Sequence, residues 1–390
     1  MNKLNFIIFF SVFLLLYSLI NFYIFLRGWQ AFAPDSPFRT PYAVAFWILA
    51  LSFIAGRFLE RVAITHFSTV IVWMGSFWFA AFAYFTLSLL LIDILRLINY
   101  GIPIFPTFIT ANLARTKMIV GFGLTTIVIG ALAFGYLNAR NPRVKLLGVH
   151  IPKQIDTLQT LNIAVASDIH LGTIIGRDRL NAIVDKINSL HADLVLFPGD
   201  IVDEDLAPVI HQNLGETLRT IKAKYGVYAI TGNHEYIGGV EEACKYLTEH
   251  GIRILRDEVV TVNGGITLVG REDRSISQFN GRKRKPLADL MAGIDKRHPI
   301  ILMDHQPFGL NEAVEQEVDL QLSGHTHHGQ LWPFNAITNA VYELSWGYKK
   351  KGNTQFYVSS GVGTWGPPVR LGNTPEIIHL RITFGQQPSS

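Results

Sequence analysis

Residues 161–170 of this chain read LNIAVASDIH, an apolar run that ends in Asp168 and His170. A short apolar run that stops at polar or turn residues is typical of a buried strand. The same arrangement returns at residues 192–200, 226–235, 299–305 and 318–327. Amphipathic segments such as 177–190, whose apolar residues have helical spacing, lie between these runs. Strands that alternate with helices predict a layered domain of the α/β type.

Polar residues at the ends of these five predicted strands form a candidate metal site. In chain order they are Asp168, His170, Asp200, Asn233, His305, His325 and His327. Ligand sites in α/β sheets lie outside the carboxyl ends of the strands, so we expect these side chains to converge. Residues two apart in an extended chain point the same way, so Asp168 and His170 are expected to share one face. His325 and His327 repeat that spacing.

Glycines stand beside these polar residues at three strand ends. Gly199, Gly232 and Gly324 precede Asp200, Asn233 and His325 in the sequence. Glycine tolerates tight turns and lets backbone approach a ligand closely. Any one of these motifs is common in ordinary polar loops. Five of them in succession favour a built site over chance.

The composition changes at about residue 139. Before it the chain is dominated by apolar residues, with charge-free runs at 4–26, 40–56, 68–92 and 118–139. Each run is near or above the roughly 17–20 residues that cross a hydrocarbon core as a helix. The first run is longer than the ~7–15 apolar residues of a signal peptide, so we expect it to be retained. The sequence therefore predicts an all-α membrane domain of about four transmembrane helices at residues 1–140 and a second domain at residues 141–390.

Charge limits the partners of the second domain. Up to residue 138 there are eight Lys and Arg against three acids, a net +5, while the whole chain carries +4. The second domain is thus close to neutral, and no nucleic-acid-binding face is expected. Six cations flank the apolar runs on the side of the N-terminus and five on the other side, which favours an inner N-terminus. Four helices put both ends on one side, so the second domain is expected on the cytoplasmic side. The single cysteine, Cys244, excludes an internal disulfide and is expected in the core of a helix.

The five motifs together resemble the calcineurin-like metallophosphoesterase superfamily. The series Asp-x-His, Gly-Asp, Gly-Asn-His-Glu, His and Gly-His-x-His covers residues 142–384. Residues 323–330 and 361–376 are similar to a bacterial branch that carries an N-terminal membrane segment. The resemblance implies an α+β sandwich of two mixed sheets packed face to face with flanking helices. It also implies a multi-pass protein of a bacterial cytoplasmic membrane.

The resemblance further implies two divalent metal ions, which the mixed nitrogen and oxygen ligands suggest are Mn, Fe or Zn. One ion would be held by Asp168, His170, Asp200 and His327. The other would be held by Asp200, Asn233, His305 and His325, with Asp200 bridging the two. His234 would stay off the metals and act on the substrate. Glu235 is expected to support a histidine.

Other residues near these motifs are candidates for substrate contact or for contact with lipid. Trp365, Pro367, Pro368 and Arg370 are expected to form an aromatic and cationic wall, by analogy with the branch. His328 stands where the branch usually has glycine, and it is a candidate for substrate contact. Protein phosphatases of the superfamily have an arginine where this chain has Glu204, which disfavours that activity. The basic cluster 282–285 is either a solvated loop or a site for anionic lipid headgroups.

The resemblance predicts hydrolysis of a phosphodiester or pyrophosphate bond. A hydroxide held between the metals would attack in line, and His234 would donate a proton to the leaving oxygen. A lipid-linked substrate is favoured because the helices keep the site at the bilayer, and the branch is distantly similar to UDP-diacylglucosamine hydrolases. A soluble nucleotide or phosphodiester, with the helices as anchor only, is the alternative. A metal-stabilised sensor without enzymatic activity is a third possibility, which the complete ligand set disfavours.

Overall fold

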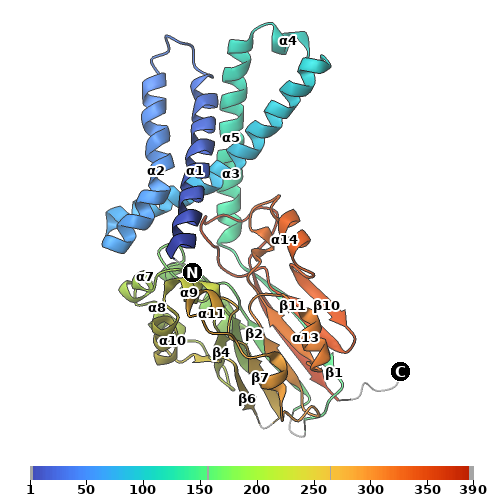
Figure 1. Cartoon of the computed structure of the whole chain (residues 1–390). Helices are drawn as coiled ribbons and strands as arrows, with labels where there is room; N and C mark the ends of the chain where they lie inside the picture. The colour runs from blue at the N-terminus through green and yellow to red at the C-terminus, as the bar shows by residue number, and fades with distance from the viewer. Residues whose placement is uncertain (1–2, 156–157, 264, 386–390) are drawn as a thin grey trace. The chain divides into compact units, whose positions relative to one another are not determined.

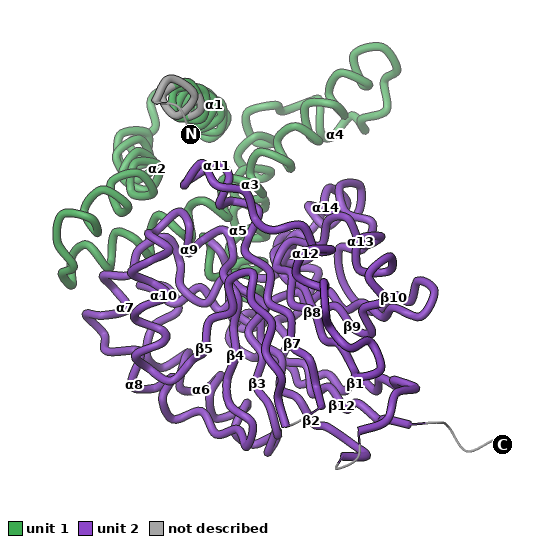
Figure 2. The backbone as a smooth tube through the Cα atoms, turned by 60° about the horizontal axis from the view of Figure 1, so that its bottom comes forward, with its two compact units in different colours: residues 1–136, 366–369 green, residues 137–365, 370–390 purple. Residues whose placement is uncertain are grey.

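The computed structural model describes residues 3–155, 158–263 and 265–385, and the chain divides into two compact units (Figure 2). The first unit holds residues 1–136 and 366–369, and the second holds residues 137–365 and 370–390. The proposed domain boundary at residue 140 lies four residues beyond this division. The grouping of residues 366–369 with the N-terminal helices was not predicted from the sequence.

The first unit is helical (Figure 1). Its helices are α1 (Lys3–Trp29), α2 (Arg39–Val62), α3 (His66–Gly101), the short α4 (Thr107–Thr110) and α5 (Leu113–Ala139), whose last turn belongs to the second unit. Among the described residues, α1, α2, α3 and α5 are long and apolar enough to cross a membrane. The four predicted apolar runs are therefore confirmed as four helices of that kind.

Small residues let α2 and α3 pack closely. A Cβ atom at Gly75 would lie 2.4 Å from the Cα atom of Phe53, so only glycine fits there without displacing backbone. Polar side chains inside the helical unit have partners, as burial in an apolar setting requires. The indole nitrogen of Trp78 donates to Oδ1 of Asn21 at 3.1 Å. The hydroxyl of Tyr17 donates to the carbonyl of Ala50 at 2.8 Å.

The second unit contains two six-stranded sheets. The first sheet has the order β1 (Arg143–Ile151), β12 (Glu376–Phe384), β2 (Thr160–Val165), β3 (Leu194–Pro198), β4 (Val227–Ile230) and β5 (Arg253–Ile254). The second has the order β10 (Gly347–Lys351), β11 (Thr354–Val358), β9 (Leu320–Ser323), β8 (Ile300–Met303), β7 (Ile266–Gly270) and β6 (Glu258–Val262). Both are mixed: β2, β3 and β4 are parallel while β12 is antiparallel to β2, and β8 and β9 are parallel while β6 is antiparallel to β7. The predicted pair of mixed sheets is confirmed.

Short helices flank the sheets. They are α6 (Arg177–Ser189), α7 (Ala207–His211), α8 (Leu214–Leu218), α9 (Asn233–Gly238), α10 (Val240–Glu249), α11 (Ile276–Phe279), α12 (Leu287–Met291), α13 (Leu310–Glu315), α14 (Asn335–Val341) and the 3-10 turn η1 (His327–Gly329). The predicted helix at 177–190 matches α6, which buries Leu180, Ile183 and Ile187. Cys244 is buried in α10, as predicted.

The two sheets share one hydrophobic core. Alternate residues of the first sheet, such as Ile163 and Leu196, belong to the same buried cluster as Leu268 and Leu320 of the second sheet. Truncation of such a side chain to alanine typically costs about 2–5 kcal/mol. The core therefore holds the parallel strands of both sheets in a fixed register. The loops that follow those strands start from a rigid edge.

Candidate metal centre

Loops after five strands bring the predicted polar residues together. Asp168 and His170 follow β2, Asp200 follows β3, and Asn233 begins α9 after β4. His305 follows β8, and His325 and His327 follow β9. The first three loops leave the first sheet and the last two leave the second sheet. The site is thus built from the carboxyl ends of parallel strands in both sheets, as expected for an α/β arrangement.

The backbone at these residues is left-handed rather than extended. Positive φ angles occur at Asp168 (56°), His170 (55°) and Asp200 (53°), and again at His325 (70°) and His327 (46°). The expected extended backbone at Asp168 and His170 is therefore wrong, although both side chains reach the same group of candidate ligands, as predicted. Residues other than glycine rarely adopt this conformation, which concentrates at functional sites. Ile169, between the first two, points into the core and is 1 % exposed.

Two of the predicted glycines are needed for close packing. A Cβ atom at Gly324 would lie 1.9 Å from Oγ of Ser167 and 2.2 Å from Oδ2 of Asp168. A Cβ atom at Gly232 would lie 2.1 Å from Oδ1 of Asp200. Both contacts are far inside van der Waals distance, so any larger residue would displace a candidate ligand.

One group of candidate ligands contains Asp168, His170 and His327. Nε2 of His170 lies 2.9 Å from Nε2 of His327, and the latter lies 3.5 Å from Oδ1 of Asp168. The Asp168 carboxylate is held by the backbone amide of His325, which donates to Oδ1 at 2.8 Å. Loops from the two sheets are thus joined at this point. Ligand atoms of the three side chains lie within 4.8 Å of one another, a spacing that suits one metal ion.

A second group contains Asp200, His305 and His325. Nε2 of His305 lies 3.0 Å from Oδ2 of Asp200, and Nδ1 of His325 lies 2.8 Å from Oδ1 of Asn233. Nδ1 of His305 donates to the carbonyl oxygen of Pro198 at 2.7 Å. That bond places a ring proton on Nδ1 and turns Nε2 toward the Asp200 carboxylate.

Asp200 connects the two groups. Its Oδ2 atom lies 3.8 Å from Nε2 of His170 as well as 3.0 Å from Nε2 of His305. Its other oxygen, Oδ1, accepts a hydrogen bond from the backbone amide of His234 at 2.9 Å. Burial alone would raise the pKa of Asp200, but the nearby His305 outweighs it and holds the pKa well below the usual range. The carboxylate is therefore ionised and able to face two cations at once.

The donor set fits divalent cations. Among the described residues, Oδ2 of Asp168 is buried without a hydrogen-bond partner. Unpaired buried polar atoms are rare and indicate a ligand or ion. Burial lowers the pKa of His325 to about 3 and, with His170 beside it, holds the pKa of His327 well below its usual range. Both rings are therefore neutral, which is the form that binds a metal.

Asp203 is a site residue that the motif search did not single out. Its Oδ1 atom lies 2.9 Å from Nδ1 of His234 and 3.5 Å from Nδ1 of His170. Burial alone would raise the pKa of Asp203, but the two histidines hold it far below the ordinary carboxyl range. The signal was present in the sequence, because Asp203 stands three residues after Asp200 in Gly-Asp-Ile-Val-Asp.

Glu235 has a different role from the one expected. Its carboxylate accepts hydrogen bonds from the backbone amides of Gly232 (2.7 Å), Val202 (2.9 Å) and Asp200 (3.2 Å). It touches backbone rather than a histidine ring, which corrects the prediction that it supports a histidine. By satisfying three buried amides, it holds the loop after β3 against the start of α9.

The remaining candidates lie around this centre. The Trp365 ring is 6.1 Å from the His234 ring and is half exposed. Arg370 is fully buried, and its guanidinium donates to the carbonyl of Gly363 and contacts Nδ1 of His327 at 3.1 Å. It therefore supports the loop under His327 instead of presenting a cationic wall. His328 stacks on Trp346, with ring centroids 5.1 Å apart.

The basic cluster 282–285 is partly structural. Arg284 donates to Oδ1 of Asp304 at 2.8 Å, and Arg271 donates to Oδ2 of the same carboxylate at 3.1 Å. Asp304 directly precedes His305 in the chain. Arg282, Lys283 and Lys285 are exposed. Of the four cations, Arg284 therefore stabilises the loop that carries His305.

Comparison with known proteins agrees with this geometry. The calcineurin-like phosphoesterase family matches residues 161–329. An uncharacterized metallophosphoesterase of Helicobacter pylori (strain J99) is 36 % identical over 63 % of this chain and 65 % of its own length. A metallophosphoesterase of Aquifex aeolicus is 31 % identical over 57 % of this chain and 85 % of its own. A transmembrane protein with metallophosphoesterase domain from Danio rerio is 32 % identical over 66 % of this chain and 61 % of its own.

The family match covers the strand-end loops from Asp168 to His327. The chain spans about two thirds of the length of the Helicobacter relative and most of the Aquifex relative. Sequence, fold and site geometry point to one family. This chain belongs to the calcineurin-like metallophosphoesterases.

Proposed function

We propose that this protein is a metal-dependent phosphoesterase that hydrolyses a phosphodiester or pyrophosphate bond of a lipid-linked substrate. The family and the clusters of buried histidines and carboxylates support the hydrolytic activity. Four helices that are long and apolar enough to cross a membrane support a membrane location for the protein. The choice of a lipid-linked substrate rests on one observation, an apolar rim beside the candidate ligands.

We assign two divalent cations to the site. Asp168, His170, Asp200 and His327 would hold one ion, and Asp200, Asn233, His305 and His325 would hold the other. When bound, two such cations neutralise phosphoryl oxygens and lower the pKa of a water molecule. The protein itself supplies buried ring nitrogens and one carboxylate that approaches both groups of histidines. Asp168, His170, Asp200 and His305 are all at most 2 % exposed.

His234 is placed to handle the leaving group. Its ring is 4.5 Å from the His170 ring and meets it edge to face, and Nδ1 contacts Asp203. Burial alone would lower the pKa of His234, but Asp200 and Asp203 outweigh it and raise it to about 9 in the metal-free site. Nδ1 is occupied by Asp203, so Nε2 is the atom that would donate a proton to the leaving oxygen.

The apolar rim follows the metal-binding loop directly. It consists of Trp332, Ile337, Val341 and Trp365, which are 61 %, 58 %, 55 % and 48 % exposed. The side chain of Gln330 joins its two parts, since it donates to the carbonyl of Trp365 and accepts from the Trp365 amide, both at 2.9 Å. At the other end of α14, the Tyr342 ring lies 6.1 Å from the His325 ring.

Large apolar side chains that are exposed together beside a polar site are typical of a binding surface, whereas single exposed ones are ordinary. Tryptophan in particular suits the interface between apolar chains and water. No residue of α14 is buried, so this helix presents its apolar side chains outward. A substrate whose phosphate sits at the metals and whose acyl chains lie on this rim would use both features.

The test compares two pyrophosphates that differ in their acyl chains. Detergent-solubilised full-length protein with Mn²⁺ is assayed on CDP-diacylglycerol and on CDP-choline. We expect a higher kcat/KM for the lipid-linked compound. A variant with Trp365→Ala and Ile337→Ser should lose at least about tenfold of that preference, since burial of one large apolar side chain contributes about 1.5–3 kcal/mol.

Leu146→Ser is the matched control for the rim. Leu146 is 74 % exposed on β1, outside the strand-end loops, so its removal should leave the preference unchanged. Equal kcat/KM values for the two compounds in the wild type would instead support a soluble phosphodiester or nucleotide as substrate.

A further inference from the structure

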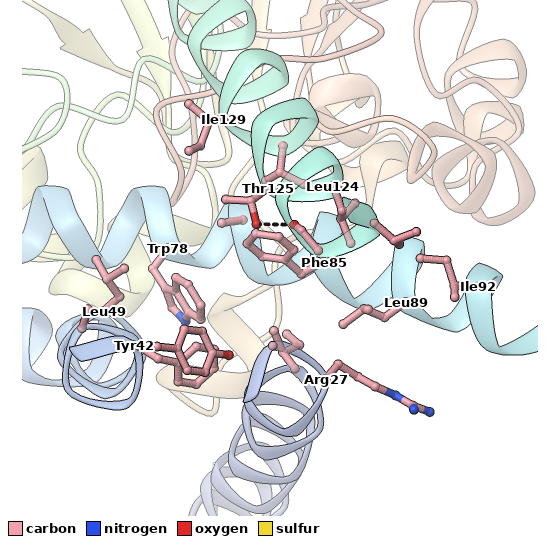
Figure 3. A pocket seen from close by; sticks show the side chains of 18 of the residues that line it. Arg27, Tyr42, Leu49, Trp78, Phe85, Leu89, Ile92, Leu124, Thr125 and Ile129 are labelled. Atoms are coloured by element: carbon pink, nitrogen blue, oxygen red, sulfur yellow. Dashed lines mark hydrogen bonds between the residues drawn. The ribbon is translucent and has the colours of Figure 1, made fainter. Parts of the chain in front are cut away.

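The helical unit contains a large apolar cavity of about 1190 Å³. It lies between α5 on one side and α1, α2 and α3 on the other, and every residue that lines it belongs to the first unit. Figure 3 shows Leu124 and Thr125 of α5 on one side and Trp78 and Tyr42 on the opposite side. Ligand pockets commonly measure about 300–1,000 Å³, so this cavity holds more than a drug-sized molecule.

The shape of the cavity suits a long chain. Its lining along α3 runs from His66 to Arg96, and 30 residues of helix span about 45 Å at 1.5 Å per residue. That exceeds the ~30 Å thickness of a hydrocarbon core. Lining side chains along the way are apolar or aromatic, among them Trp73, Phe85 and Leu89. Water would find few polar partners there, whereas a hydrocarbon chain would match the lining.

Cations gather at one end of the cavity. Arg27 lies in the last turn of α1, Arg96 near the end of α3, and Lys117 near the start of α5. All three line the cavity. The short connection through α4 brings the end of α3 and the start of α5 to the same end of the bundle.

These cations are in excess over acids. Within the described residues, Asp93 is the one acidic side chain that lines the cavity. Asp93 pairs with Arg27 and, at 3.0 Å, with Arg96. Among the described residues Lys117 has no ion-pair partner. An anion at this end would therefore meet uncompensated positive charge.

We propose that this cavity binds one phospholipid with an anionic headgroup. The acyl chains would occupy the apolar length, and the phosphate would be held by Arg27, Arg96 and Lys117. Arginine is suited to this task because its planar guanidinium can donate two hydrogen bonds to a phosphate. The lipid would come from the leaflet at the Arg27 end of the helices. The site lies wholly in the first unit and does not depend on the proposed hydrolytic function.

The test measures lipid binding directly. Full-length protein in detergent is titrated with dioleoyl-phosphatidylglycerol or dioleoyl-phosphatidylcholine, and the first bound lipid is quantified by native mass spectrometry. We expect tighter binding of the anionic lipid. Arg96→Gln should weaken phosphatidylglycerol about fivefold, the equivalent of the roughly 1 kcal/mol that one cation contributes to an anionic lipid surface. Arg115→Gln is the control, because Arg115 is an exposed cation of α5 that does not line the cavity.

A second pair of variants tests the apolar part. Leu124→Trp places a larger side chain in the lining of the cavity and should weaken binding of the first lipid. Ile127→Trp, at a 69 % exposed position of the same helix outside the lining, should leave that binding unchanged. If Leu124→Trp does not elute as a single species, Ile129→Trp takes its place, since Ile129 also lines the cavity. Wild-type binding in the lining variant that is measured, or equal affinity of the wild type for the two lipids, would overturn the proposal. Neither readout requires hydrolysis.

Discussion

Oδ1 of Asp203 lies 2.9 Å from Nδ1 of His234, and this contact leaves Nε2 as the ring nitrogen that does not face the Asp203 carboxylate. The same oxygen lies 3.5 Å from Nδ1 of His170, a candidate metal ligand. One buried carboxylate thus links the candidate proton donor to the metal centre. Contacts of this kind orient catalytic and ligating rings.

Replacing the Asp203 carboxylate should reduce turnover more than metal binding. Asp203→Asn removes the negative charge beside His234, so the ring loses its orientation and its raised pKa. We expect kcat on an aryl phosphodiester to fall about 10–100-fold, the usual range for such supporting residues. Metal content, measured by atomic emission, should stay near the wild-type value. Asp205→Asn, two residues further along, is the control, and equal kcat in both variants would contradict the assignment.

The metal-free protein should show a pH-dependent contribution from His234. Burial alone would lower its pKa, but Asp200 and Asp203 raise it to about 9. A group whose pKa is raised on folding stabilises the fold below its unfolded pKa, about 6.5 for histidine, and loses that contribution as pH rises through the folded pKa. With the metal removed by a chelator, the Tm of the wild type near pH 6 should therefore be higher than the Tm of His234→Gln. The difference should shrink between about pH 7 and 9.5, and a constant difference would argue against the raised pKa.

Asp200→Asn should abolish hydrolysis, because Asp200 is the carboxylate that approaches both groups of histidines. Metal removal gives an independent readout. Ligand binding at a thousandfold excess over Kd stabilises a fold by roughly 4 kcal/mol, so a chelator should lower the Tm of the wild type by several degrees. The Tm of Asp200→Asn should respond much less. Undiminished metal-dependent hydrolysis in this variant would contradict the two-ion arrangement.

Gly324→Ala should disrupt the site through steric contact alone. Its Cβ atom would lie 1.9 Å from Oγ of Ser167 and 2.2 Å from Oδ2 of Asp168. We expect loss of metal binding together with a reduced Tm. Gly148→Ala is the matched control, since a Cβ atom there meets nothing within 4 Å. Similar metal affinity in the two alanine variants would show that the loop can shift to accommodate the methyl group.

Much of the fold followed from local pattern. Apolar runs predicted the five strands that lead to the site, and hydropathy predicted the four long helices, because both signals depend on neighbouring residues alone. The predicted ends were close to those observed: the run at 318–323 became β9 at Leu320–Ser323. Cys244 was expected in a helix core for the same reason and is found there.

Other features could not be read from local pattern. Asp168 and His170 were expected to share a face through extended geometry, but both have left-handed backbone. Glu235 was expected to contact a histidine, yet it accepts from three backbone amides that only the packing of two loops brings near. Arg370 was expected in an aromatic and cationic wall, yet it is fully buried and its guanidinium contacts the carbonyl of Gly363 and the ring of His327. Each outcome depends on contacts between residues far apart in the chain.

The sequence by itself determined the two kinds of unit, the succession of the five site strands along the chain and the residue types at the ends of those strands. These are properties of composition and short-range periodicity. Only the tertiary structure decided how the ends meet: Asp168 receives the amide of His325 from the other sheet, and Asp200 lies between histidines from both. The reason is physical, since the positions of the loops are set by packing two sheets over one core. The role of Asp203 arises in the same way, through a buried contact that exists only after the loops converge.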